Sequence, residues 1–330
     1  MAKVDPVEDL KGTLQEMCVQ LREDHVPYEF VEGFSLEDFQ PKLVNAVDRI
    51  SLNARRICFA FSEPPIPTQT EVAGLIARMK KACTDVLAVF AELPRSQGCT
   101  LRRGVAGHLN ELYDAVEDFV SAINSESECC LQAAGKLWEK CDAIERIPKD
   151  NKEAVCSVLS SHYEFIQDAV NEIHESMEED EALALDLQRM PARNGLNQPR
   201  FTWSPQERAL LNPGIGLAKT FRITMRKVSA AVDSHGRCIS MQENEELDKI
   251  ADLFRVSSSF MDDFVTTLYP PITATAVQEN GATLKAHVLN MLNTTKDSHF
   301  YNSAEEDWVE FLEHATEHNY QNLLSRIDDL

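Results

Sequence analysis

The sequence contains few of the residues that form tight turns. Its 330 residues include only 12 glycines and 14 prolines. An all-β protein of this length needs many more turn residues between its strands. Apolar residues make up 43% of the chain, which is ordinary for a globular protein and too many for a disordered one. We therefore expect an all-α protein with a sizeable buried core.

Long apolar runs and paired cysteine motifs are also missing. No stretch of about 18 uncharged apolar residues occurs, so we expect no membrane span. The first ten residues carry four charges and no apolar run, so we expect no signal peptide. The nine cysteines are odd in number and include no CxxC pair, which favours reduced thiols in an intracellular protein over a disulfide framework.

Positive charge is scarce. There are 32 Lys and Arg against 54 Asp and Glu, a net charge of −22. Residues 1–187 hold 18 basic and 35 acidic side chains, and residues 188–330 hold 14 and 19. Because nucleic-acid affinity depends largely on neutralising phosphates, this balance argues against direct binding of DNA or RNA.

The positive signal is apolar spacing of three and four residues, which is typical of amphipathic helices. A stripe of this kind early in the chain comprises Val47, Ile50, Ala54, Ile57, Cys58 and Phe61. A later one comprises Val155, Val158, Leu159, Phe165, Ile166, Ile173 and Met177, and the last comprises Trp308, Phe311, Leu312 and Ala315. No convincing alternation typical of strands is seen.

Helix-start signals divide these stripes into long segments. Short polar residues followed by an acid at the third position resemble capping boxes at Ser35, Ser125, Asp150, Ser204, Ser240 and Ser303. Short proline- or glycine-containing breaks between them predict antiparallel neighbours. The least regular stretch sets the predicted boundary, which gives an N-terminal acidic helical bundle at 1–187, an irregular linker at 188–203 and a C-terminal helical bundle at 204–330.

Two local patterns resemble catalytic or cofactor motifs. His314, Glu317 and His318 match the HxxEH form of inverted zincins, in which the histidines hold zinc and the glutamate acts as a base. Only twelve residues follow His318, which leaves little chain for a further ligand. Gly214 and Gly216 follow a proline and no strand, so they lack the context of a nucleotide-binding turn. We predict no catalytic residue, no metal and no cofactor.

One segment is basic against the acidic background. Between residues 188 and 237 there are nine Arg and Lys and two acids, and residues 168–186 before it carry eight acids and no Lys or Arg. On one continuous helix, four of the basic residues would share a face: Arg208, Lys219, Arg222 and Arg226. This face is either a site for an anionic partner or the internal complement of the acidic segment.

A short pattern in the same segment, Arg208-Ala209-Leu210-Leu211, has the R-x-L-apolar form that cyclins recognise. Leu210 and Leu211 also suit the core face of a helix, which would hide them.

Several strings, in order along most of the chain, resemble the cyclin-D-binding protein family, also described as maternal inhibitor-of-differentiation-like helix-loop-helix regulators. They are LPRSQGCTLR at 93–102, IPKDNK at 147–152, LYPP at 268–271, TKDSH at 295–299 and DW at 307–308. The resemblance implies a two-part helical bundle related in shape to vinculin and talin domains. It also implies a regulator, nuclear and cytoplasmic, that restrains the cell cycle and transcription by binding D-type cyclins, helix-loop-helix factors or signalling adaptors.

The residues agree with this resemblance on one mechanistic point. A DNA-binding helix-loop-helix protein needs a basic helical extension, and none precedes a helical hairpin here. We therefore expect a non-enzymatic regulator that sequesters its partners without contacting DNA. The alternatives are a cytoskeletal scaffold bundle that binds amphipathic helices or actin and, more remotely, a zinc hydrolase.

Overall fold

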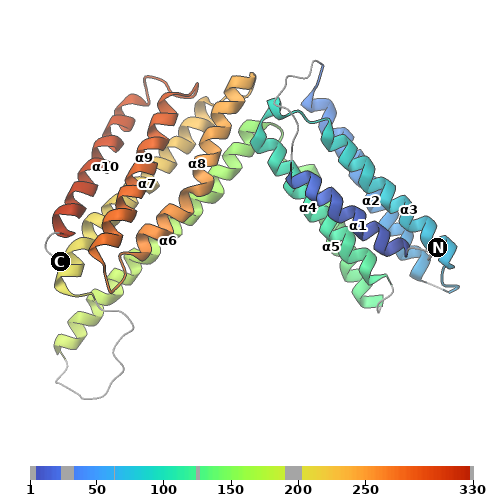
Figure 1. The fold of residues 1–330 in the computed structure, drawn as a ribbon, viewed down its shortest axis with the longest axis horizontal. Helices are drawn as coiled ribbons and strands as arrows, with labels where there is room; N and C mark the ends of the chain where they lie inside the picture. Colours follow the sequence, from blue (N-terminus) through green and yellow to red (C-terminus); the bar gives the residue numbers. More distant parts are fainter. Residues whose placement is uncertain (1–4, 24–32, 63, 124–126, 190–202, 328–330) are drawn as a thin grey trace. The chain divides into compact units, whose positions relative to one another are not determined.

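A computed structural model describes residues 5–23, 33–62, 64–123, 127–189 and 203–327, with the side chains of 127–129 and 183–189 left out (Figure 1). This part of the chain contains ten α-helices and two short 3₁₀ turns and no β-strand, which confirms the all-α prediction. The α-helices are α1 Pro6–Arg22, α2 Leu36–Ser62, α3 Gln69–Ala91, α4 Cys99–Ala122, α5 Ser127–Ala143, α6 Asn151–Arg189, α7 Pro205–His235, α8 Met241–Thr266, α9 Ala274–Lys296 and α10 Glu306–Ile327. None of these, over the described residues, has the length and apolarity needed to cross a bilayer.

The chain folds as two compact units that divide between Ala154 and Val155. The division lies earlier than the predicted one, because α6 is a single helix whose buried residues pack with the helices that follow it. Residues 155–187, predicted to lie in the N-terminal bundle, therefore belong to the second unit. Most of the predicted linker, residues 190–202, lies outside the described residues.

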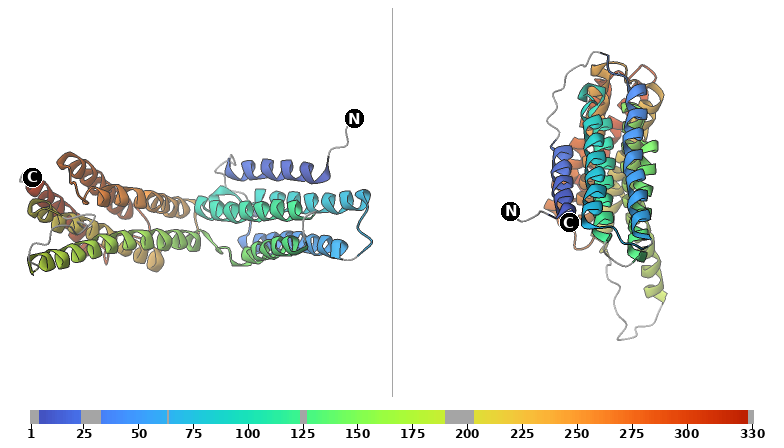
Figure 2. Two further views of the ribbon diagram at one scale, coloured as in Figure 1. Left: turned by 90° about the horizontal axis from the view of Figure 1, so that it is seen from below. Right: turned by 90° about the vertical axis from the view of Figure 1, so that its right-hand side faces the viewer.

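The first unit is an antiparallel bundle. Helix α2 packs against both α3 and α5, and α4 packs against α5. The side chains show the direction of one pair, since Arg49 of α2 meets Asp85 of α3 and Asn53 meets the carbonyl of Arg78. Helix α1 lies along α3 and α4 (Figure 2), which have few contacts with each other. Leu10 and Leu14 of α1 are buried.

The second unit joins α6 to the four helices that follow. Helix α10 packs against α7 and α9, and α8 packs against α9. Figure 2 shows that helices lie lengthwise alongside one another within each unit. Trp203 closes the start of α7, because its buried indole donates a hydrogen bond of 2.8 Å to the carbonyl of Leu268.

The predicted helix starts are confirmed where the structure describes a complete cap. Ser204 and Ser240 form capping boxes with Glu207 and Glu243. A third box, Thr68 with Glu71, starts α3 and was missed, although its sequence has the same spacing. The helix start predicted at Ser303 is wrong, because α10 begins at Glu306. Ser125 lies outside the described residues.

Two residues that were predicted to lie in the core are exposed instead. Phe165 of α6 and Phe311 of α10 are 58% and 66% exposed. In α10 the buried face runs instead through Val309, Leu312, Thr316, Tyr320 and Leu323. Apolar residues that repeat every three or four positions cover a broad face of a helix. An apolar residue at the edge of that face can therefore point to solvent. The relation to vinculin and talin stays a prediction.

Candidate interaction surfaces

The predicted basic face on α7 begins with an internal ion pair. Arg208 Nη2 lies 2.6 Å from Asp180 Oδ2 of α6, and this carboxylate is only 4% exposed. A buried carboxylate is strongly destabilising without a cationic partner, so Arg208 is bound to the fold. Asp180 belongs to the acidic segment 168–186, and the pair is therefore of the internal kind that the charge pattern allowed.

The other three basic residues of this face are arranged differently. Lys219 and Arg222 are half-buried on α7, Arg226 is exposed, and none of the three forms an ion pair with a described residue. Arg226 lines a groove of about 230 Å³ between α6 and α7, together with Tyr163 and Asp233. Three of the four residues thus stay together on one side of α7, and their binding of an anionic partner stays a prediction.

The cyclin-type pattern in α7 is hidden by the fold. Leu210 and Leu211 are 0% and 1% exposed, and Arg208 is held by Asp180. A docking groove that recognises an arginine and a leucine in an extended peptide cannot reach these side chains unless the first turns of α7 unwind. The interpretation of Leu210 and Leu211 as core residues is confirmed.

The HxxEH pattern lies on the outer side of α10. His314, Glu317 and His318 are all exposed. Glu317 pairs with Lys285 of α9 at 2.5 Å, and His318 Nε2 lies 3.0 Å from the side-chain nitrogen of Asn322. Among the described residues, no group of three or more His, Cys, Asp or Glu side chains is placed to hold a metal ion. The geometry does not favour the zinc interpretation.

The two glycines of α7 serve helix packing. The helix is continuous through Pro213, so Gly214 and Gly216 lie within α7 and not in a nucleotide-binding turn. A Cβ atom at Gly214 would lie 2.8 Å from Leu268 Cδ2, and one at Gly216 would lie 2.9 Å from Asn319 Oδ1. These glycines let neighbouring side chains approach the backbone of α7.

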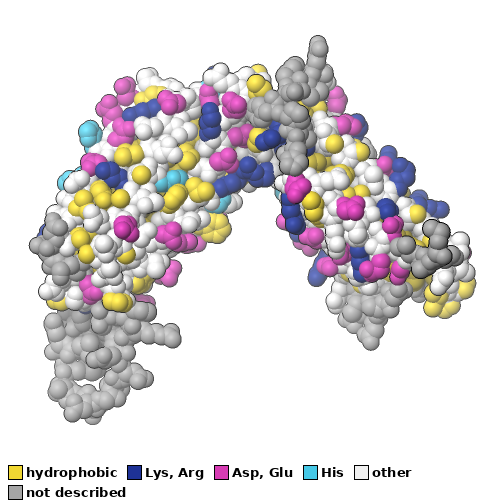
Figure 3. Space-filling view, viewed as in Figure 1, with side chains coloured by type: hydrophobic (Ala, Val, Ile, Leu, Met, Phe, Trp, Pro, Cys, Tyr) yellow, Lys and Arg dark blue, Asp and Glu magenta, His cyan; other side chains and the backbone are white. Residues whose placement is uncertain are grey.

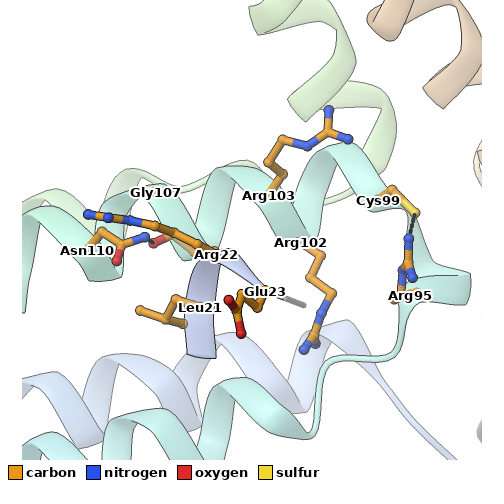
Figure 4. A pocket seen from close by; sticks show the side chains of 10 residues that line it. Leu21, Arg22, Glu23, Arg95, Cys99, Arg102, Arg103, Gly107 and Asn110 are labelled. Atoms are coloured by element: carbon orange, nitrogen blue, oxygen red, sulfur yellow. Dashed lines mark hydrogen bonds between the residues drawn. The ribbon is translucent and has the colours of Figure 1, made fainter. Parts of the chain in front are cut away.

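An arginine-lined hollow of about 590 Å³ lies in the first unit, between the end of α1 and the start of α4 (Figure 4). Arg102 is 3% exposed, stacks 4.2 Å from the ring centre of Phe90, and donates to the carbonyls of Phe90 and Leu93. Figure 4 shows Arg103 turned away from Arg102, so the guanidinium groups do not converge on one point. We assign no ligand to this hollow.

Polar contacts join two loops of the second unit. The backbone N–H of Arg237 donates to His299 Nε2, so the other ring nitrogen carries the proton and donates to Glu246 at 2.8 Å. Burial raises the pKa of Glu243, but the Arg237 guanidinium and two backbone N–H groups outweigh it and lower that pKa to about 2. These polar side chains form hydrogen bonds and ion pairs within the fold, and we interpret them as structural contacts.

A surface that the sequence analysis missed lies on α2 and the turn after it. Leu52 and Phe59 of α2 and Ile66 of the turn are 46%, 83% and 74% exposed. The signal was present, since Leu52 and Phe59 are seven residues apart and both lie off the predicted stripe that runs through Val47, Ile50, Ala54 and Ile57.

Comparison with known proteins covers both units. The model of the Grap2 and cyclin-D-interacting N-terminal region matches residues 42–179, and that of the C-terminal region matches residues 175–293. The two matches meet inside α6.

Several curated proteins are similar over nearly the whole chain. A "Cyclin-D1-binding protein 1 homolog" from Danio rerio is 34% identical and covers 88% of this chain and 87% of its own. A homolog of the same name from Xenopus laevis is 28% identical, with 96% and 97% covered. The Homo sapiens "Cyclin-D1-binding protein 1" is 26% identical, with 98% and 94% covered.

Proposed function

This chain belongs to the family of Grap2- and cyclin-D-interacting proteins, and on that premise we propose that it is a non-enzymatic regulator that binds a D-type cyclin. The observation that carries the proposal is the similarity to cyclin-D1-binding proteins, which extends through both units and is not confined to one segment. The names of these relatives describe binding.

The buried state of the cyclin-type pattern constrains how such binding occurs. Because Leu210 and Leu211 lie in the core, we propose that the cyclin contacts the folded outer surface of the chain and not an extended Arg208–Leu211 segment. Unwinding these turns would expose both leucines and separate Arg208 from Asp180. The burial of one leucine alone is worth about 2 kcal/mol.

The experiment is isothermal titration calorimetry of the full chain with a purified D-type cyclin, with a B-type cyclin as the specificity control. We expect saturable binding of the D-type cyclin that the control does not reproduce. The double variant Asp180→Asn/Arg208→Gln removes both charges of the pair together, and we expect its affinity to stay within about twofold of wild type. Absence of binding would refute the proposal, and a large loss in the double variant would show that Arg208 itself docks.

The finer part of the proposal is that the chain sequesters helix-loop-helix factors without contacting DNA, and so restrains transcription and cell-cycle progression. The net charge of −22 supports it, since an acidic surface repels the phosphate backbone. In a gel-shift assay at physiological salt, we expect added chain to release a helix-loop-helix factor from duplex DNA. Binding of the chain itself to the duplex would contradict this mechanism.

We also propose that the protein is present in both cytoplasm and nucleus, where such partners act. Fluorescence imaging of the tagged full chain tests this directly. Confinement of the signal to one compartment would overturn it.

A further inference from the structure

The outward ridge of α2 combines apolar and basic side chains. Leu52 and Phe59 point to solvent seven residues apart, which is two helical turns or about 10 Å along the axis. Arg55 and Arg56 are exposed between them. An exposed phenylalanine flanked by arginines is the residue composition that binding surfaces favour.

A hollow continues this ridge at the turn between α2 and α3. It has a volume of about 710 Å³ and is lined by Ala60, Ile66, Leu75 and Arg78, with Gly74 leaving space on the α3 side. In Figure 3, hydrophobic side chains gather at the end of the unit where α2 turns into α3. The ridge and the hollow together form what we term the α2–α3 surface, which comprises Leu52, Arg55, Arg56, Phe59, Ile66 and Arg78.

The charge of this surface is opposite to that of the chain. Arg55, Arg56 and Arg78 form no ion pair with any described residue. The nearby acid Asp85 is already neutralised by Arg49 and Lys81, at 3.4 and 3.1 Å.

Two further acids lie close to the surface. Glu71 is bound in its capping box, where the hydrogen bonds from the backbone N–H and the hydroxyl of Thr68 lower its pKa. Asp48 is exposed one turn before Leu52. Among the described residues of the α2–α3 surface and its edge, three arginines and one acid have no ion pair, so this part of the surface is cationic on a protein of net charge −22.

We propose that the α2–α3 surface docks an acidic amphipathic helix of a partner protein. Apolar side chains of that helix, spaced at i, i+3 or i+4 and i+7, pack on Leu52 and Phe59 and into the hollow beside Ile66. Its Asp and Glu side chains meet Arg56 and Arg78. Charge complementarity selects this partner, because a basic helix would be attracted to the rest of the acidic chain and repelled here. The inference does not depend on cyclin binding.

The test uses a designed probe and the full chain. The probe is an 18-residue fluorescein-labelled peptide with leucine on one helical face and glutamate elsewhere, and its control carries lysine in place of glutamate. Fluorescence anisotropy is expected to show saturable binding of the glutamate peptide, weakened by added salt.

Two variants test whether the peptide binds at the α2–α3 surface. Arg56→Glu/Arg78→Glu and, separately, Phe59→Ala are each expected to weaken binding of the glutamate peptide about tenfold. The matched control is Lys249→Glu/Arg326→Glu, which changes the net charge equally at exposed positions of the second unit, and its affinity should stay within about twofold of wild type. Circular dichroism checks that each variant folds. If Arg56→Glu/Arg78→Glu does not fold, Arg56→Gln/Arg78→Gln is used in its place.

Three results would overturn the inference. An equal loss of affinity in the control variant would mean that net charge alone attracts the peptide. Equal or tighter binding of the lysine peptide would reverse the charge assignment. Finally, capture of phosphatidylserine-containing vesicles, dependent on Arg56 and Arg78, without binding of the glutamate peptide would assign the surface to a lipid membrane.

Discussion

The two units contain similar amphipathic helices but differ in the surroundings of their unpaired cations. The unit of residues 1–154 has 18 Lys and Arg against 26 Asp and Glu, and the unit of residues 155–330 has 14 against 28. Both units pair cations with acids of their own fold, as Lys80 with Asp9 in the first unit and Arg208 with Asp180 in the second. The second unit leaves Lys219, Arg222 and Arg226 without an ion pair to a described residue, along one side of α7. The first leaves Arg55, Arg56 and Arg78 facing solvent beside exposed apolar groups. The surroundings of the unpaired cations, more than the net charge of each unit, therefore distinguish the two units.

The largest expected effect concerns a close approach in the first unit. Gly98 has a φ of +117°, and a Cβ there would lie 1.9 Å from Asn151 Cγ, whose amide oxygen accepts from the N–H of Leu101. Gly98→Ala should destabilise this unit by about 3 kcal/mol or more. Gly104→Ala is the control, since nothing lies within 4 Å of its Cβ, and it should stabilise by about 0.5 kcal/mol.

Urea denaturation followed by tryptophan fluorescence distinguishes the units. Trp138 reports the first, and Trp203 and Trp308 report the second. A neutral Gly98→Ala would show that the approach to Asn151 is not required.

The next largest effect is expected from breaking the ion pair between Arg208 and Asp180 in the second unit. Arg208→Ala leaves Asp180 buried and unpaired, and should cost about 2–3 kcal/mol of unfolding free energy. Arg56→Ala, on the exposed ridge, should change stability by less than about 0.5 kcal/mol. Both are measured by the same urea denaturation. Equal costs for the two variants would contradict the contrast between the units.

A third prediction uses a histidine in the core of the second unit. Burial lowers the pKa of His287 to about 4. An unfolded histidine takes up its proton near pH 6.5, so stability is complete above that value and falls as the pH drops towards 4. Between pH 7.5 and pH 5 the loss should be about 2 kcal/mol.

Thermal unfolding across this pH range measures the effect, and His287→Leu should flatten the dependence. If that variant kept the wild-type slope, another group would be responsible. The first unit, followed through Trp138, should change less over the same range.

The smallest effect tests a feature that both units share. Thr68 and Ser240 each cap a helix by the same box, in the first and second unit respectively. Alanine at either position should cost about 1 kcal/mol in the unit that contains it. Urea midpoints that moved in the wrong unit would show that the units do not unfold separately.

The sequence was sufficient for the helices and for most of the core, because both depend on local spacing. Val47, Ile50, Ala54 and Ile57 are buried as predicted, and Ser204 and Ser240 cap as predicted. The unit boundary was not predictable in this way. Residues 155–187 continue one helix, and only contacts with distant helices assign them to the second unit.

The surfaces were predicted less well, because pairing across a fold is not a local property. The spacing of Arg208, Lys219, Arg222 and Arg226 placed them on one helix face, but it could not show that Asp180 meets Arg208. Conversely, the sequence does not distinguish Leu52 and Phe59 from core residues, and only the exposed fraction of each side chain shows that the described part of the fold leaves them open to solvent.

We expect partners to bind the folded outer surface of this bundle. Hydrogen–deuterium exchange of the full chain, with and without a D-type cyclin, tests it most directly. We expect slower exchange on exposed helix faces and unchanged, slow exchange in the first turns of α7, where Leu210 and Leu211 are buried. Faster exchange in those turns on cyclin binding would contradict it, because the core pattern would then have been released to dock.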